Sequence, residues 1–321
     1  MLAATTEVNF HSRLDSRARR LISKLTFAGD AEKLDPVQAR RAYNFSRRQY
    51  VWPTETVGDI TSIERSFDGT PALKVFRPRE SGEEHQRESY VFLHGGGWTL
   101  GDLFTYEPLC RRLANQLDAN VIWVEYRLAP EYPFPAALDD AVAAVHWLFK
   151  HAENLGLDPR RISLIGDSAG ANVAAVLALL NRRAEYGWKF ERQVLIYPCL
   201  DLTASYPSHR EFGSGYLLTR ELYGWYRKNY IGDHDPKDWR VSPIFAAGLK
   251  DVAPAVILRA GFDPLRDEAS AYARRLRLAG VPVHEIFFPE MIHGFLNMGA
   301  VLPQADIALQ QIKGAIQRHG S

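Results

Sequence analysis

Ser168 lies in a pattern that suits nucleophilic catalysis. Residues 165–170 read Ile-Gly-Asp-Ser-Ala-Gly, and they end a short apolar run and open a long helical pattern. A Gly-x-Ser-x-Gly pattern between a strand and a helix is typical of a nucleophile elbow, a turn so tight that a Cβ at position 166 or 170 would collide with neighbouring backbone. The pattern predicts that Ser168 is held on a strained turn with its hydroxyl exposed.

A second pattern, His94-Gly95-Gly96-Gly97-Trp98, follows an earlier apolar run. Consecutive glycines let backbone N–H groups turn toward one point, which stabilises the oxyanion that develops during acyl transfer. We predict that Gly95 and Gly96 donate these hydrogen bonds, with the Ala169 N–H as a third donor. The alternative is a phosphate-binding loop, but the dinucleotide pattern Gly-x-Gly-x-x-Gly fails because position 100 is Leu.

A serine nucleophile needs a base, and the base needs an orienting carboxylate. In the elbow fold these follow the serine in the order acid, then histidine. Asp263 stands where a later predicted strand becomes a loop, and His293 lies in a glycine-containing loop after the last predicted strand. We predict Asp263 as the acid, with Asp267 as the alternative, and His293 as the base. His284 falls within a predicted strand and is interpreted as structural.

These residues need a sheet to position them. Short apolar or β-branched runs predict eight strands, at 60–67, 73–77, 89–93, 121–126, 162–165, 193–197, 255–260 and 284–288. Helical patterns lie between them, at 105–117, 135–151, 168–185, 265–279 and 304–318. Strand alternating with helix predicts an α/β fold with a mostly parallel, doubly wound sheet. The first two strands alternate in polarity across a short turn, which indicates an antiparallel hairpin at the sheet edge.

Two regions do not fit that alternation. Residues 1–50 contain two amphipathic helical segments, the second opened by Asp35 as N-cap and Pro36 at the first helical position. Residues 201–248 hold Ser/Pro-rich loops and an aromatic helix at 218–230. We expect both regions to form a cap over the carboxyl edge of the sheet, where such folds bind ligands. The predicted organisation is cap helices at 1–50, catalytic core at 51–200, cap insertion at 201–248 and core again at 249–321. Cap residues expected to contact substrate are Phe212, Tyr216, Leu217 and Tyr223.

Taken together, His-Gly-Gly-Gly-Trp, Tyr126-Arg-Leu-Ala-Pro-Glu131, Gly-Asp-Ser-Ala-Gly, Asp263-Pro-Leu and His293-Gly-Phe resemble the motifs of one family. It is the bacterial hormone-sensitive-lipase-like esterases of the α/β-hydrolase fold (family IV, Gly-Asp-Ser-Ala-Gly branch), and the resemblance runs from Ser89 to Phe295. It implies an eight-stranded sheet with helices on both faces and a helical cap. It also implies a carboxylesterase that hydrolyses short- to medium-chain acyl esters through an acyl-enzyme.

Residue by residue, the resemblance implies that Ser168 is the nucleophile, His293 the general base and then acid, and Asp263 its orienting carboxylate. Positions that look structural in this family are His94, Tyr126, Arg127, Glu131, Asp139 and Asp167. Two alternatives stay open: an amidase or other acyl hydrolase using the same triad, and a non-catalytic small-molecule receptor of this fold. An intact His293 argues against the receptor.

Composition indicates which classes of binding partner and cofactor to expect. The 321 residues carry 39 Lys+Arg and 38 Asp+Glu, a net charge of +1 that does not favour nucleic acid. The two cysteines, Cys110 and Cys199, are expected to be buried free thiols in a reducing compartment, so we expect a cytoplasmic protein without integral membrane contact. Residues 1–50 are locally basic, which we interpret as the solvent-exposed face of amphipathic helices, with a membrane-surface role as the alternative. The sequence implies no metal or cofactor, because no His-Glu-x-x-His occurs and 233–238 lacks the glycine and glutamate of a calcium loop. An exposed eighth strand would permit a homodimer.

Overall fold

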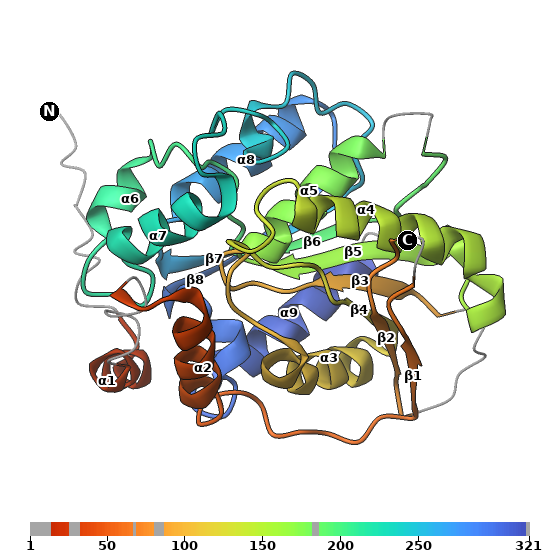
Figure 1. Cartoon of the computed structure of the whole chain (residues 1–321), viewed down its shortest axis with the longest axis horizontal. Helices are drawn as coiled ribbons and strands as arrows, with labels where there is room; N and C mark the ends of the chain where they lie inside the picture. The colour runs from red at the N-terminus through yellow and green to blue at the C-terminus, as the bar shows by residue number, and fades with distance from the viewer. Residues whose placement is uncertain (1–13, 26–32, 67–68, 80–86, 182–185, 319–321) are drawn as a thin grey trace, which may run out of the picture.

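Figure 1 shows the fold in a computed structural model that describes residues 14–25, 33–66, 69–79, 87–181 and 186–318. Its centre is one eight-stranded sheet with the order β1-β2-β4-β3-β5-β6-β7-β8. All neighbouring strands from β4 to β8 are parallel, and β2 pairs antiparallel with both β1 and β4. The predicted mostly parallel sheet with an antiparallel edge hairpin is therefore confirmed. The strands are β1 (Asp59–Ile63), β2 (Leu73–Arg77), β3 (Ser89–Leu93), β4 (Asn120–Val124), β5 (Ile162–Asp167), β6 (Gln193–Ile196), β7 (Ala255–Phe262) and β8 (Val283–Ile292).

Helices cover both faces of this sheet (Figure 1). One face carries α3 (Leu103–Leu117) and α9 (Gln304–Arg318), and the other carries α4 (Ala136–His151), α5 (Ala169–Leu180) and α8 (Arg266–Leu278). Every residue of β3, β4, β5 and β6 is buried, as expected for strands covered on both sides. Short 3-10 turns lie at Glu153–Leu155, Pro159–Arg161, Pro243–Phe245 and Phe295–Met298.

The predicted strand ends agree with the structure to within two residues, except in the first and last strands. The first was expected to reach Phe67, but β1 ends at Ile63, which pairs with Leu73, the first residue of β2. Phe67 and Asp68 lie outside the described residues. The last strand is longer than predicted, because β8 continues to Ile292 beside β7 through a register shift between Ala260 and Phe262. Pro289 is tolerated there because β8 is an edge strand.

The helices of the two regions outside the alternation are α1 (Ser16–Lys24), α2 (Pro36–Arg47), α6 (Pro207–Glu211) and α7 (Arg220–Ile231), and Figure 1 shows them on one side of the molecule. The predicted start of α2 is confirmed: Pro36 is the first helical residue, and the Asp35 carboxylate accepts hydrogen bonds from the Val37 and Gln38 N–H groups, both at 3.0 Å. Residues 1–13 and 26–32 of the predicted N-terminal cap lie outside the described residues.

Helix α2 is attached to the core by Arg40 and by Asn44, whose side-chain amide donates to the Asp102 carboxylate at 2.6 Å. The Arg40 guanidinium donates to the carbonyl oxygens of Thr99 and Ala129, both at 2.8 Å, and to the Glu131 carboxylate at 2.8 and 2.6 Å. Ala39 and Tyr43 on the same helix form a small apolar cluster with Trp225 and Tyr226 of α7 and with Leu100. Segments far apart in sequence therefore meet above the glycine-rich loop.

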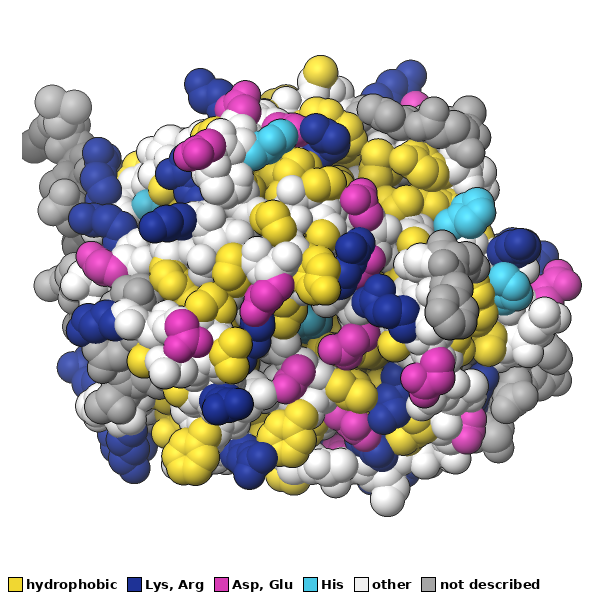
Figure 2. Space-filling view, in the orientation of Figure 1, with side chains coloured by type: hydrophobic (Ala, Val, Ile, Leu, Met, Phe, Trp, Pro, Cys, Tyr) yellow, Lys and Arg dark blue, Asp and Glu magenta, His cyan; other side chains and the backbone are white. Residues whose placement is uncertain are grey.

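Basic and acidic side chains are interspersed over the described part of the face in Figure 2, in keeping with the net charge of +1. Both cysteines are buried free thiols, as predicted. Among the described helices, none has both the length and the apolar character that a bilayer span requires.

Candidate active site

Ser168 stands between the central strand β5 and helix α5, with φ +54° and ψ −117°. A non-glycine residue at positive φ is strained, and surrounding structure must hold it there. A Cβ added at Gly166 would lie 2.6 Å from the Gly170 backbone, and one at Gly170 would lie 2.0 Å from the Leu93 carbonyl oxygen. The predicted steric reason for both glycines is therefore confirmed, and the strained turn lifts the Ser168 side chain above the strand ends.

The structure brings the predicted triad residues together. The Ser168 Oγ lies 2.9 Å from His293 Nε2, and His293 Nδ1 lies 2.8 Å from Asp263 Oδ2. Because a carboxylate only accepts, Nδ1 carries the proton that is donated to Asp263, and Nε2 is left to accept from the serine hydroxyl. Asp263 has no exposed surface, and its other oxygen accepts from the Leu265 N–H at 2.8 Å. This arrangement can remove a proton from Ser168 and stabilise the imidazolium that results.

The alternative acid, Asp267, faces elsewhere. One of its oxygens accepts from the Ser208 N–H at 3.0 Å and the other from the Arg266 guanidinium at 2.8 Å. His284 lies in β8, as expected from the sequence, with its Nε2 at 3.3 Å from an Arg318 nitrogen. Of the two candidate carboxylates, Asp263 is therefore the one that is hydrogen bonded to His293.

The glycine-rich loop departs from the prediction at one donor. The Gly95 N–H donates to the Asp167 carboxylate at 2.7 Å, so it is not available to an oxyanion, and the prediction of Gly95 as a donor is wrong. Gly96 (φ +109°) and Gly97 (φ +59°) turn into the cavity instead, and both line it together with Ala169. The N–H of Ala169 belongs to the first turn of α5, where no intrahelical acceptor exists.

Buried polar groups hold this loop in place. Burial raises the pKa of Asp167 to about 6, although the Gly95 N–H, the charge of His293 and the Tyr106 hydroxyl favour its ionised form. Burial lowers the pKa of His94 to about 4, so its ring is neutral near pH 7 and hydrogen bonds to the Gly95 carbonyl at 2.7 Å. The ring also stacks on Tyr126 at 4.2 Å, and the Tyr126 hydroxyl donates to the His94 carbonyl.

Arg127 and Asp139 are two of the positions that the resemblance marks as structural. Arg127 pairs at 2.8 Å with Asp140, the residue that follows Asp139. Adjacent residues on a helix point about 100° apart, so only one of the two can face Arg127.

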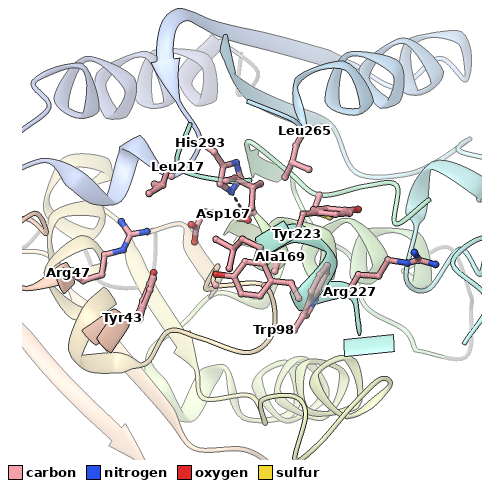
Figure 3. A pocket seen from close by; sticks show the side chains of 18 of the residues that line it. Tyr43, Arg47, Trp98, Asp167, Ala169, Leu217, Tyr223, Arg227, Leu265 and His293 are labelled. Atoms are coloured by element: carbon pink, nitrogen blue, oxygen red, sulfur yellow. Dashed lines mark hydrogen bonds between the residues drawn. The ribbon is translucent and has the colours of Figure 1, made fainter. Parts of the chain in front are cut away.

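The cavity above Ser168 is lined by the core loops and by α2 and α7 (Figure 3). Of the four predicted cap contacts, Leu217 and Tyr223 line it, whereas Phe212 and Tyr216 do not. Phe212 and Tyr216 instead pack against Phe262, with ring centroids 5.7 and 5.2 Å away. Phe212 is buried in the core beside the cavity, and Tyr216 is half-buried against that core. Their prediction as substrate contacts is wrong, because aromatic character alone does not tell a core residue from a cavity wall.

Other lining residues were missed from the sequence. Tyr43 and Arg47 reach the cavity from α2, Trp98 follows the glycines, and Tyr226 comes from α7. The spacing of Tyr43 and Arg47 places them on one face of a helix, which was the available signal. Trp98 is fixed by stacking on Tyr230, with ring centroids 4.1 Å apart.

Comparison with known proteins places this geometry in a family. Residues 90–297 match the family described as alpha/beta hydrolase fold. The chain is 44% identical over 235 residues to carboxylic ester hydrolase LipN of Mycobacterium tuberculosis, which covers 71% of this chain and 62% of that protein. It is 37% identical to ethyl acetate hydrolase of Pseudomonas putida, covering 83% of each. The structure of a hyperthermophilic esterase from the archaeon Pyrobaculum calidifontis superposes with a TM-score of 0.85 at 34% identity, covering 96% of this chain and 99% of that one.

The eight-stranded sheet with helices on both faces is the α/β-hydrolase fold. The chain belongs to the α/β hydrolase family. Within it, the relatives are carboxylic ester hydrolases, as the resemblance to hormone-sensitive-lipase-like esterases implied. The protein is an ester hydrolase of that group.

Proposed function

We propose that this ester hydrolase works through a Ser168-His293-Asp263 triad and an acyl-enzyme. The observation that carries the proposal is the unbroken chain of hydrogen bonds from Ser168 Oγ to His293 Nε2 and from His293 Nδ1 to Asp263 Oδ2, at 2.9 and 2.8 Å. These hydrogen-bonded residues lie at the carboxyl ends of parallel strands, and Ser168 and His293 line a cavity there.

In the proposed reaction, Ser168 Oγ attacks the ester carbonyl while His293 Nε2 accepts its proton. His293 then gives that proton to the leaving alcohol, and the acyl group stays bonded to Ser168. Water, deprotonated by the same nitrogen, releases the acid and restores the serine. The oxyanion of each tetrahedral intermediate accepts hydrogen bonds from the N–H groups of Gly96, Gly97 and Ala169, where Gly97 replaces Gly95.

We further propose that the substrates are small-molecule esters with short- to medium-chain acyl groups. Bulky side chains that crowd the cavity support this, among them Trp98, Leu222, Tyr223 and Tyr226. The name of the Pseudomonas relative, ethyl acetate hydrolase, also points to small esters. In this proposal α2 and residues 201–248 act as the cap that limits acyl length, and residues 51–200 and 249–321 act as the catalytic core.

The test is hydrolysis of p-nitrophenyl esters from acetate to palmitate by wild type, Ser168→Ala and Ser46→Ala. Ser46 is the matched control because its hydroxyl lines the same cavity but donates to the Tyr43 carbonyl at 2.9 Å. Ser168→Ala is expected to lower kcat by about 10⁴-fold or more, and Ser46→Ala to leave it nearly unchanged. A folded Ser168→Ala protein with wild-type activity would refute the triad.

Assembly and location are separate proposals. We propose a homodimer through β8, the edge strand of the sheet, supported by the unpaired strand edge and by Phe287, which is 40% exposed. We propose a cytoplasmic location, supported by two buried thiols that are not joined in a disulfide. Light scattering of the purified protein and cell fractionation test these two proposals.

A further inference from the structure

The cavity wall contains an arginine with a hydrogen-bond donor that has no acceptor among the described residues. Arg47, on the last turn of α2, lines the same cavity as Ser168 and His293 (Figure 3). Its Nη1 atom is buried and has no hydrogen-bond partner among the residues that the structure describes. The guanidinium also interacts with the Tyr43 side chain, so Nη1 is the part that lacks an acceptor. An arginine stays charged in proteins, and a buried donor without an acceptor is costly. The position is therefore unusual for a residue that serves packing alone.

The guanidinium is directed toward the reacting groups. It lies over the Tyr43 ring, 4.8 Å from the centroid, which holds its plane. Its Nη2 atom is 3.7 Å from the place that a Cβ on Gly294 would take, and Leu217 Cδ2 is at the same distance. Arg47 therefore stands beside the residue that follows His293, within reach of a group on a bound ester.

Asp167 is the buried carboxylate in this neighbourhood, and it does not use the free donor. Its oxygens accept from the Gly95 N–H at 2.7 Å and from the Tyr106 hydroxyl at 3.2 Å. Arg47 acts on it only at longer range, by charge. Asp167 thus balances part of the arginine's charge but leaves the Nη1 hydrogens without an acceptor.

We propose, resting on the function proposed above, that Arg47 binds a carboxylate of the substrate, so that the enzyme favours esters that also carry a free carboxylate. A guanidinium matches a carboxylate with two parallel N–H···O bonds, and such charge-assisted bonds are stronger than neutral ones. The lining around it is largely apolar, with Leu202, Leu218, Leu222 and Leu265, which suits the carbon chain between the two functional groups. The carboxylate can belong to the acyl part or to the alcohol part of the ester.

Two matched substrate pairs distinguish a carboxylate in the acyl part of the ester from one in the alcohol part. For the acyl part, the mono-p-nitrophenyl ester of glutaric acid is compared with the p-nitrophenyl ester of glutaramic acid, which carries a neutral amide in place of the carboxylate. For the alcohol part, 4-acetoxybenzoate is compared with 4-acetoxybenzamide. We expect wild type to favour the carboxylate member of one pair by about tenfold or more in kcat/KM.

The variants are Arg47→Met, Arg47→Lys and the control Arg227→Gln. Arg227 also lines the cavity, but it is exposed, and Figure 3 shows its guanidinium on the opposite side from that of Arg47. Arg47→Met should abolish the preference, Arg47→Lys should keep part of it, and Arg227→Gln should keep most of it because water screens an exposed charge. The readout for each variant is the ratio of kcat/KM between the two members of a pair, because any loss of activity common to both members cancels in that ratio.

Binding without turnover gives a second readout. Calorimetry should show that glutarate binds Ser168→Ala protein and that adding Arg47→Met weakens this binding by about tenfold or more. Equal wild-type rates within both pairs would overturn the proposal, and so would an Arg47→Met variant that loses both members of a pair equally. If Arg47→Met fails to fold, the proposal is still tested by the preference of wild type for the carboxylate substrate and by the partial loss of that preference in Arg47→Lys. Failure of the esterase proposal appears separately, as a wild type that does not hydrolyse p-nitrophenyl butyrate.

Discussion

The strand-end loops and the cap line one cavity from opposite sides, and they are built by different forces. Ser168, Asp263 and His293 each follow the last residue of a strand, so the register of β5, β7 and β8 sets their spacing. Leu217 and Arg47 come from segments that no strand pairing positions. The difference indicates that backbone hydrogen bonding places the proposed catalytic residues, whereas side-chain packing places the residues that we propose select the substrate.

The cap is anchored to the core by buried polar contacts. Glu268 has no exposed surface, and it accepts from the Leu200 N–H at 2.5 Å and pairs with His209 of α6 at 2.8 Å. Burial raises the pKa of Glu268 to about 7. Burial alone would lower the pKa of His209, but its bond to Glu268 raises it. The His209 ring contacts Tyr223, a cavity residue, with centroids 5.0 Å apart, so this anchor reaches the cavity wall.

The largest expected effect tests the strand-end side. Asp263→Asn should lower kcat/KM by about 10³-fold or more, because an amide cannot hold His293 in the required tautomer or stabilise its charge. Asp267→Asn is the matched control four residues away and should retain most activity. The measurement is hydrolysis of p-nitrophenyl butyrate with folding checked by circular dichroism. Equal losses of activity in Asp263→Asn and Asp267→Asn would mean that both substitutions act by destabilising the fold and not through His293.

The second prediction concerns stability on the same side. The pKa of Asp167 is about 6 when folded against 3.8 for an ordinary aspartate, so between these values the folded state binds more protons than the unfolded state. Its contribution to the free energy of unfolding therefore falls as pH rises through this window, by roughly 3 kcal/mol in total. Asp167→Asn cannot ionise and should remove that fall.

Urea unfolding at pH 4, 5, 6 and 7 measures the effect as the difference between wild type and variant. Asp59→Asn is a suitable control because that side chain is 61% exposed and paired with Arg77 at the sheet edge. If Asp167→Asn kept the full pH dependence of wild type, ionisation of this carboxyl would not oppose folding.

The smallest effect is expected in the cap. Leu217→Trp should narrow the cavity and lower kcat/KM on the longest accepted acyl chains by about tenfold, with acetate little affected. Tyr216→Leu is the control, since that side chain packs on Phe262 outside the cavity. The p-nitrophenyl ester series measures both. A shift of the chain-length optimum in the Tyr216 variant would show that neighbouring core packing also sets selectivity.

The sequence predicted the mostly parallel sheet, its antiparallel edge and the three residues at the strand ends, because each depends on local patterns of strand, turn and glycine. It did not show that the Gly95 N–H is unavailable to an oxyanion. A run of three glycines does not reveal which N–H is taken by a distant side chain, and here Asp167, 72 residues away, takes that of Gly95.

The sequence by itself determined which residues form the proposed triad, because Ser168, Asp263 and His293 each follow a strand of one parallel sheet and local motifs mark those places. Only the tertiary structure decided the shape and polarity of the cavity. It placed Phe212 in the core with the half-buried Tyr216 against it, left Leu217 and Tyr223 on the cavity wall, and brought Arg47 beside Gly294. The physical reason is that strand ends are ordered by short-range backbone geometry, whereas cap helices are ordered by contacts between residues far apart in the chain.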